Sequence, residues 1–562
     1  MKYERPDIAE VKAELKRLTE DLSRADSYEK AKELFLAKDK IERHMYSLVS
    51  LVNIRHSIDT RDKFYDDENE FWDNTIPELQ ESLDEWTRAM LKSTYRDELA
   101  AEFGDVVFIN AEIEAKSFNP AIIPLLQEEN KLTTEYSKLI ASAQIEFKGG
   151  TYTLAQMGKY KQDDDDETRL AAWKADGAWL KANSNKLDEI YDKLVKIRHE
   201  MSLKLGLKDY IKLGYYRMQR NCYDRDDVET FREAVVKYVV PLADKIRRIQ
   251  AERIGVEYPM SYADDDLMFR SGNPKPKGDA DDILEAGRKF YDALSPETSE
   301  FFNMMLDCEL MNVLATEGKE GGGYCTGIHD YEVPFIFANF NGTSGDVDVV
   351  THEAGHAFAD WMNRKRVPVS TVWPTMEGCE VHSMSMEFFA WMNIEDFYGD
   401  DAKKACYSHL AGALTFIPYG TMVDHFQHIM YEHPEMTPAD RHAEWRRLLG
   451  IYMPHLKLDG DIPFYSDAMG WERQSHIYTS PFYYIDYCLA QTVALEFWAL
   501  IQEDPKAAWK RYIAYTEQGG SDVFTKIIEK AGLESPFEGD TLRKVCEKAG
   551  AWLDAFDLTG IE

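Results

Sequence analysis

The pattern in this chain with the clearest chemical potential is the pentapeptide His352-Glu353-Ala354-Gly355-His356. Residues four apart lie one above the other on a helix, so the imidazoles of His352 and His356 can reach one metal ion. Catalytic zinc sites use such ligands and keep one position open for water. Glu353, beside the first histidine, is placed to act on that water. The spacing therefore predicts a hydrolytic centre with one zinc ion per chain.

The residues around this motif fit a helix with one buried face. Four apolar side chains share that face at about 100° per residue, namely Val350, Ala354, Ala357 and Trp361. The two histidines then point to the opposite side. Gly355 costs a helix interior about 1 kcal/mol relative to alanine. We therefore expect another part of the chain to approach its backbone closely.

A third metal ligand is expected in the next predicted helix, because catalytic zinc usually has three protein ligands. The acidic candidates there are Glu377, Glu380 and Glu387. Glu380 and Glu387 are seven residues apart and share a face of a helix rich in Met, Phe and Trp, which predicts burial. Buried carboxylates need partners, and a zinc ion for one and an imidazole N–H for the other would satisfy both. His382 lies off this face and is expected to pack.

The elements that must position these residues are mostly helical. Helical periodicity runs almost throughout residues 6–145 and again over 166–206, and the acidic run 163–167 is expected to start the second stretch because acidic residues suit a helix N-terminus. Residues 334–340 are aromatic and β-branched and end at Asn341-Gly342, which predicts a strand and a turn. A small sheet is therefore expected beside the metal. Its edge could bind an extended peptide, or the strand could only pack the helix.

Composition limits the partners of the protein. A net charge of −35 over 562 residues disfavours nucleic acid and anionic membranes, which need clustered basic residues. No apolar run approaches the ~20 residues that span a bilayer, and the N-terminus has no signal-peptide pattern. The seven cysteines are scattered and form no C-x-x-C pair, which fits a reducing compartment. We expect a cytoplasmic protein whose partners are neither membranes nor nucleic acid.

Together with its surroundings, the motif resembles the oligoendopeptidase F and thimet oligopeptidase family of zinc peptidases. Glu380 follows His356 by 24 residues, in an E-x-x-S-x-x-x-E pattern that ends at Glu387. Further similarity lies upstream, in Phe340-Asn341-Gly342-Thr343 and Asp346-Val347, and downstream, in His476-Ile477-Tyr478 and Pro481-Phe482-Tyr483-Tyr484-Ile485-Asp486-Tyr487. The resemblance covers about residues 200–562, while the first 200 match only in being helical.

The resemblance implies a role for each of these positions. The metal ligands would be His352, His356 and Glu380, which decides against Glu377. Glu387 would support the ligands from behind, and Glu353 would be the general base. The residues expected to bind substrate and stabilise the tetrahedral intermediate are His476, Tyr484 and Tyr487. Tyr487 is the first choice as donor to the oxyanion and Tyr484 the second, whereas Tyr478 and Tyr483 are expected only to pack. One departure is Ala359, where many family members have a further histidine.

The implied fold is mainly α, with two helical lobes around a deep substrate channel and a small β-sheet beside the zinc-binding helix. Residues 1–200 would form an N-terminal helical lobe and residues 201–562 the catalytic domain. The implied function is zinc-dependent cleavage of internal bonds in short peptides, in a site too buried for folded proteins.

Two alternatives to this function remain. One is a zinc carboxypeptidase or dipeptidase with the same ligands, in which Arg473 could bind the free carboxylate of the substrate. The other is a non-catalytic helical scaffold in which the motif is accidental.

Overall fold

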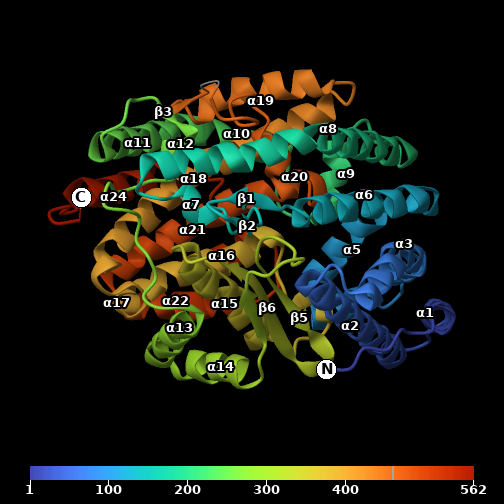
Figure 1. Cartoon of the computed structure of the whole chain (residues 1–562). Coiled ribbons are helices and arrows are strands. Elements are labelled where there is room, and N and C mark those ends of the chain that lie inside the picture. The colour runs from blue at the N-terminus through green and yellow to red at the C-terminus, as the bar shows by residue number, and fades with distance from the viewer. Residues whose placement is uncertain (459–460, 562) are drawn as a thin grey trace.

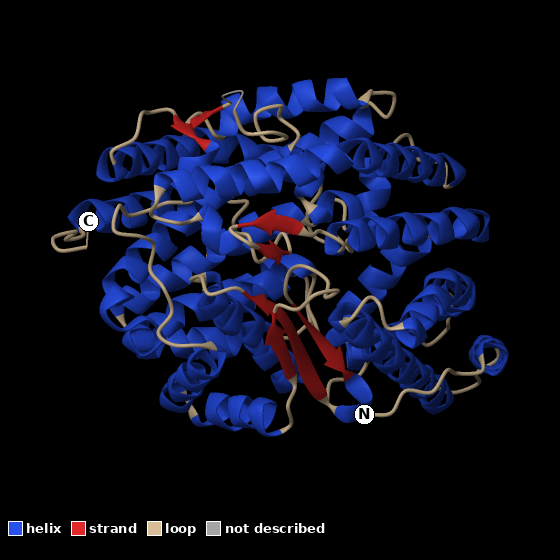
Figure 2. Ribbon diagram, in the orientation of Figure 1, coloured by secondary structure: helices blue, strands red, loops and turns tan. Residues whose placement is uncertain are grey.

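A computed structural model describes residues 1–458 and 461–561. It is mainly helical, and the strands are few and short (Figure 2), as predicted. The first part of the chain forms a series of helices: α1 (Ile8–Ser23), α2 (Tyr28–Ile58), α3 (Lys63–Leu91), α4 (Arg96–Phe103), α5 (Asp105–Ser117), α6 (Ile123–Ala141), α7 (Gly158–Lys161) and α8 (Asp166–Lys204). Helix α8 starts where the acidic run predicted, because the side chain of Asp165 accepts a hydrogen bond from the Thr168 N–H at 2.9 Å.

The remaining helices lie before and after the strands of the largest sheet in the sequence. Those before the sheet are α9 (Tyr210–Arg217), α10 (Arg225–Ala234), α11 (Val240–Ile254), α12 (Tyr262–Asp265), α13 (Ala280–Leu294) and α14 (Pro296–Asp307). Those after it are α15 (Gly345–Asn363), α16 (Met376–Phe389), α17 (Ile394–Tyr398), α18 (Ala402–Glu432), α19 (Pro438–Tyr452), α20 (Ser475–Thr479), α21 (Tyr484–Glu503), α22 (Pro505–Thr516), α23 (Phe524–Lys530) and α24 (Thr541–Ala555). Among the described residues, no helix combines the length and the apolar composition that crossing a membrane requires.

The helices form an upper and a lower layer, with short strands near the centre and the largest sheet in the lower part (Figure 1). Helices α8 and α19 lie at the top, and α13, α14 and α15 lie below, next to the largest sheet. One continuous apolar core includes side chains from both layers, so the layers share a large interface. The predicted domain division at residue 200 stays a prediction.

The largest sheet lies beside α15, as expected. Its strands are β4 (Met311–Leu314), β5 (Tyr324–Ile328) and β6 (Val333–Phe340), in the order β4-β6-β5, with β5 antiparallel and β4 parallel to β6. The predicted strand is therefore β6, but it lies in the centre of the sheet and not at its edge. Strand β5, which periodicity did not identify, is an edge strand. The other strands form two-stranded pairs: β1 (Ile145–Phe147) with β2 (Gly150–Tyr152), and β3 (Met260–Ser261) with β7 (Leu456–Lys457).

Helix α15 packs tightly on α16 at Gly355. The apolar face predicted for α15 is buried, and the expected close approach to Gly355 is present. A Cβ atom added to Gly355 would lie 2.7 Å from Cα of Ser383 and 2.8 Å from the carbonyl oxygen of His382. Since these are backbone atoms, no side-chain movement could make room. Glycine therefore lets α16 bring Glu380 up to the histidines of α15.

We predict that Gly355→Ala lowers the free energy of unfolding by about 1–3 kcal/mol, because the added methyl group overpacks this contact. Denaturant unfolding followed by circular dichroism measures the change. The matched control is Gly450→Ala in α19, where an added Cβ meets no atom within 4 Å. This control should be neutral or stabilising by up to about 1 kcal/mol. Equal effects of the two substitutions would contradict the importance of the close approach.

Candidate functional site

Three predicted ligands meet at one point between α15 and α16. The Nε2 atoms of His352 and His356 lie 3.2 and 3.3 Å from the same oxygen of Glu380, Oε2. Four-coordinate zinc with bonds of about 2.0–2.2 Å places its ligand atoms roughly 3.3 Å apart. The donor types and their separations therefore fit a zinc ion, and Glu380 rather than Glu377 completes the group. Glu377 instead accepts a hydrogen bond from Thr375 Oγ1 at 2.7 Å.

Glu387 orients the first histidine, as expected for the second buried carboxylate. The Nδ1–H of His352 donates to Glu387 Oε1 at 2.6 Å, which leaves Nε2 of His352 unprotonated toward the metal position. The other carboxylate oxygen accepts from Nε2 of His409 at 2.8 Å. Trp391 Nε1–H donates to His409 Nδ1, also at 2.8 Å, and so fixes the tautomer of His409. Although burial raises it, hydrogen bonds from both histidines lower the pKa of Glu387 to about 2. His409 belongs to no motif and was missed from the sequence.

Glu380 has two further hydrogen-bond donors. Ser383, one turn later on α16, donates from Oγ to Glu380 Oε2 at 3.0 Å. The hydroxyl group of Tyr483 donates to Oε1, the oxygen that does not face the two histidines. The expectation that Tyr483 only packs is therefore wrong. A carboxylate held through both oxygens keeps one orientation, which a metal ligand requires.

Glu353 is buried beside the metal position and has a free carboxylate oxygen. Its Oε2 atom has no hydrogen-bond partner among the described residues. A Cβ atom on Gly323, just before β5, would lie 3.2 Å from Glu353 Oε1, so this glycine leaves space next to the carboxylate. Burial raises the pKa of Glu353, an effect that His352 and His356 partly offset. A raised pKa suits a group that must accept and release a proton near neutral pH.

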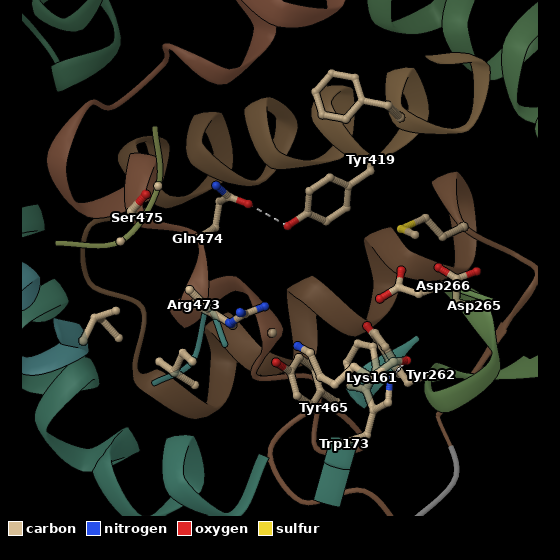
Figure 3. A pocket seen from close by; sticks show the side chains of 18 of the residues that line it. Lys161, Trp173, Tyr262, Asp265, Asp266, Tyr419, Tyr465, Arg473, Gln474 and Ser475 are labelled. Carbon is tan, nitrogen blue, oxygen red and sulfur yellow. Dashed lines mark hydrogen bonds between the residues drawn. The ribbon is translucent and has the colours of Figure 1, made fainter. Parts of the chain in front are cut away.

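A chain of hydrogen bonds from Tyr419 to Tyr487 passes through His476. Tyr419 donates its hydroxyl proton to Gln474 Oε1 at 2.9 Å (Figure 3), and the Gln474 amide nitrogen lies 3.0 Å from His476 Nδ1. Because an amide nitrogen only donates, Nδ1 accepts and the proton of the neutral ring is on Nε2. This Nε2 atom lies 3.1 Å from the Tyr487 hydroxyl oxygen.

Two properties of these hydrogen-bonded residues bear on their chemistry. Burial lowers the pKa of His476 to about 4, so the ring is neutral near pH 7. The hydroxyl proton of Tyr487 stays free to donate to another acceptor. Gln474 and Tyr419 were not identified from the sequence, since no motif links them to His476.

The other tyrosines and the other histidine considered from the sequence are buried and pack against their neighbours. Tyr484 is buried, and its ring packs edge-on against that of His476, with centroids 5.1 Å apart. Tyr478 is fully buried, and its hydroxyl donates to the Leu187 carbonyl, so it packs as predicted. His382 is also buried, and burial lowers its pKa to about 3. Tyr487 is therefore the tyrosine whose hydroxyl is joined to His476.

A second group of metal-ligand types lies elsewhere, at Asp188, His442 and Glu472. Here His442 Nε2 lies 2.9 Å from Glu472 Oε1, an ordinary hydrogen-bond distance, and 3.8 Å from Asp188 Oδ1. Burial raises the pKa of Glu472 to about 9, so this carboxyl group holds a proton at neutral pH. The 2.9 Å contact between His442 and Glu472 is that of a hydrogen-bonded pair, with Asp188 farther away.

A cavity of about 660 Å³ adjoins the His476 region. Its walls include Phe416, Tyr419 and Gln474, and the ring of Phe416 contacts those of Tyr484 and Tyr487. On another side it reaches residues 320–322, next to the glycine that faces Glu353. The cavity thus lies near the site through residues adjacent to Gly323 and His476, while Glu353, His476 and Tyr487 are not themselves among its lining residues.

Known proteins resemble this chain over nearly its whole length. Residues 1–118 match the peptidase M3 N-terminal domain, and residues 298–546 match peptidase family M3. A solved structure assigned as an oligoendopeptidase F is 45% identical, with a TM-score of 0.98 over 99% of this chain and 98% of that one. PZ peptidase A, in a structure with an inhibitor, is 44% identical, with a TM-score of 0.98 over 99% of both chains. Oligopeptidase PepF of Bacillus subtilis (strain 168) is 21% identical over 544 residues, 91% of this chain and 78% of that protein. The N-terminal match extends the similarity into the first 200 residues.

We predict that the chain retains one divalent metal ion after dialysis and that Glu380→Gln weakens metal binding at least tenfold, because one charged ligand is lost. Metal analysis with chelator competition measures this. Glu472→Gln, which alters the second group, is the control and should leave the metal content unchanged. Loss of metal from Glu472→Gln alone would place the ion in the second group and contradict the assignment to Glu380.

Proposed function

Because the chain belongs to peptidase family M3, in its oligoendopeptidase F branch, and is a peptidase, we propose that it is a zinc-dependent endopeptidase that cleaves internal bonds of short peptides. The observation that carries the zinc assignment is the convergence of two imidazole nitrogens on one carboxylate oxygen at zinc-ligand spacing. His352, His356 and Glu380 would hold the ion. Bound there, zinc supplies Lewis-acid chemistry, since it acidifies water and polarises a carbonyl group.

The side chains around this position divide the remaining work. Glu353 accepts the proton of the attacking water and passes it to the leaving amine, which its raised pKa favours. Tyr487 donates its free hydroxyl proton to the oxyanion of the tetrahedral intermediate, and His476 holds that hydroxyl from behind. A donor of this kind contributes roughly 3–4 kcal/mol to transition-state stabilisation. Tyr484 shapes the wall on which the substrate lies.

The surroundings of the site favour short peptides as substrates. Glu353 and Glu380 are buried, and the adjoining cavity has a volume of about 660 Å³. A folded protein would have to unfold locally to place a peptide bond there. The net charge of −35 argues against nucleic acid. All seven cysteines are free, which supports a reducing compartment such as the cytoplasm.

We predict that Glu353→Gln lowers kcat by about 10²–10⁴-fold, because the amide cannot accept the proton. Turnover of an internally quenched peptide measures the rate, and metal analysis of the same sample should still give one ion per chain. A variant that keeps metal and cleaves at the parent rate would contradict the role of Glu353.

Cleavage maps separate this proposal from an exopeptidase with the same ligands. We predict that mass spectrometry of a mixed peptide library finds cuts at internal bonds in peptides with free and with amidated C-termini. A carboxypeptidase or dipeptidase would instead release fragments of constant length from one terminus and would not cut amidated peptides. That second pattern would overturn the endopeptidase assignment and retain the zinc centre.

A further inference from the structure

Arg473 lines the cavity next to the residues that hold His476. It directly precedes Gln474, and both residues border the same space together with Tyr419 (Figure 3). A peptide that extends from His476 along this wall therefore meets the side chain of Arg473. The position is set by the short 3₁₀ helix Gly470–Arg473.

The guanidinium group of Arg473 has no protein partner among residues 1–458 and 461–561. It makes no hydrogen bond there, and every carboxylate oxygen lies beyond the 4.0 Å limit for an ion pair. Arg473 is partly buried, and two fully buried arginines are paired: Arg198 lies 2.7 Å from Glu129, and Arg220 lies 2.9 Å from Asp486. A cation removed from bulk water needs a counter-charge, so an anionic group from outside the chain fits here.

The neighbouring charges of the cavity are already engaged or lie on another wall. Asp176 contacts two residues of the lining: it pairs with Lys161 at 3.4 Å and accepts the Tyr465 hydroxyl proton at 2.7 Å. Asp265 and Asp266 lie on another wall (Figure 3). Their carboxylates would repel a polyanion such as a nucleotide phosphate chain. A single carboxylate on an otherwise uncharged peptide carries less negative charge and is repelled less.

We propose that Arg473 forms a subsite that binds a carboxylate group of the peptide substrate; this deepens the proposed peptidase function and rests on it. The planar guanidinium group can bind a carboxylate through two parallel hydrogen bonds. A peptide offers such a group at its C-terminus or on an Asp or Glu side chain. The subsite makes Arg473 a specificity-determining residue, separate from the groups that carry the proton and stabilise the oxyanion.

The test uses four quenched peptides of one core sequence and the full-length zinc-loaded protein. One pair differs only in a free or amidated C-terminus, and the other pair only in Glu or Gln at one position beyond the cleaved bond. The variants are Arg473→Gln and Arg473→Lys, with Arg447→Gln as the matched control. Arg447 is an exposed arginine of α19 outside the cavity lining, and it pairs with Glu444. The readouts are KM, kcat and the cleaved bond, with circular dichroism and metal content for each variant.

We expect the wild type to favour the carboxylate member of at least one pair by about tenfold in kcat/KM, the effect of one charge-assisted hydrogen bond. Arg473→Gln should reduce this ratio to about one, mainly through KM, and Arg473→Lys should restore part of it. Arg447→Gln should behave as the wild type. Preference in the first pair alone identifies the C-terminal carboxylate, and preference in the second alone identifies the acidic side chain.

Two results overturn the subsite. One is a wild type that cleaves both members of each pair within twofold of one another, a measurement that needs no variant. The other is a folded, zinc-containing Arg473→Gln protein that keeps the preference. A wild type that cuts no internal bond in any of the four peptides overturns the proposed function, and the subsite with it.

Discussion

The close contact between α15 and α16 at Gly355 is the constraint on which the proposed metal centre depends. Two ligands come from one helix and the third from the other, and ligand atoms must lie roughly 3.3 Å apart to share one zinc ion. Helix axes 8–10 Å apart are usual where side chains interpose, and a bare glycine allows a closer approach. The backbone of Ser383 and His382 fills the space that a side chain at Gly355 would need. Close packing at one residue thus sets the spacing of the three candidate metal ligands.

Buried carboxylates next to this contact are kept in different states by their hydrogen bonds. Glu387 accepts from two histidines and has a pKa of about 2, whereas Glu353 has an oxygen without a partner and a raised pKa. The first is therefore a fixed anion that orients His352. The second can exchange a proton. Neighbouring acids with opposite shifts are a common arrangement in hydrolytic sites, because each role needs a different environment.

The hydrogen-bond chain from Tyr419 through Gln474 and His476 to Tyr487 links the cavity wall to the proposed oxyanion donor. Within it, the amide group of Gln474 donates to Nδ1 of His476 and so fixes the ring proton on Nε2. The same stretch of chain carries Arg473 on the cavity side. The proposed carboxylate subsite and the residues that hold His476 therefore lie on the same short segment, so the proposed position of the substrate is tied to that of His476.

The sequence by itself determined the features that depend on local periodicity. Four-residue spacing on a helix placed His352 and His356 together, the glycine between them indicated a close approach, and the seven-residue spacing of Glu380 and Glu387 put both on one face. Family resemblance added the choice of Glu380 and the cluster around Tyr487. These features could be predicted because the relative positions of residues on one helix depend only on their spacing in the sequence.

Only the tertiary structure decided the contacts made across large sequence separations. It brought Tyr483 to Glu380, 103 residues apart, and Tyr419 to Gln474, 55 residues apart. It also placed His409 behind Glu387 and made β5, rather than the predicted β6, an edge of the sheet. None of these pairs has a fixed spacing, because side-chain partners on separate helices are chosen by how the helices pack. The reactive groups were thus readable from the sequence, while the residues that orient them required the fold.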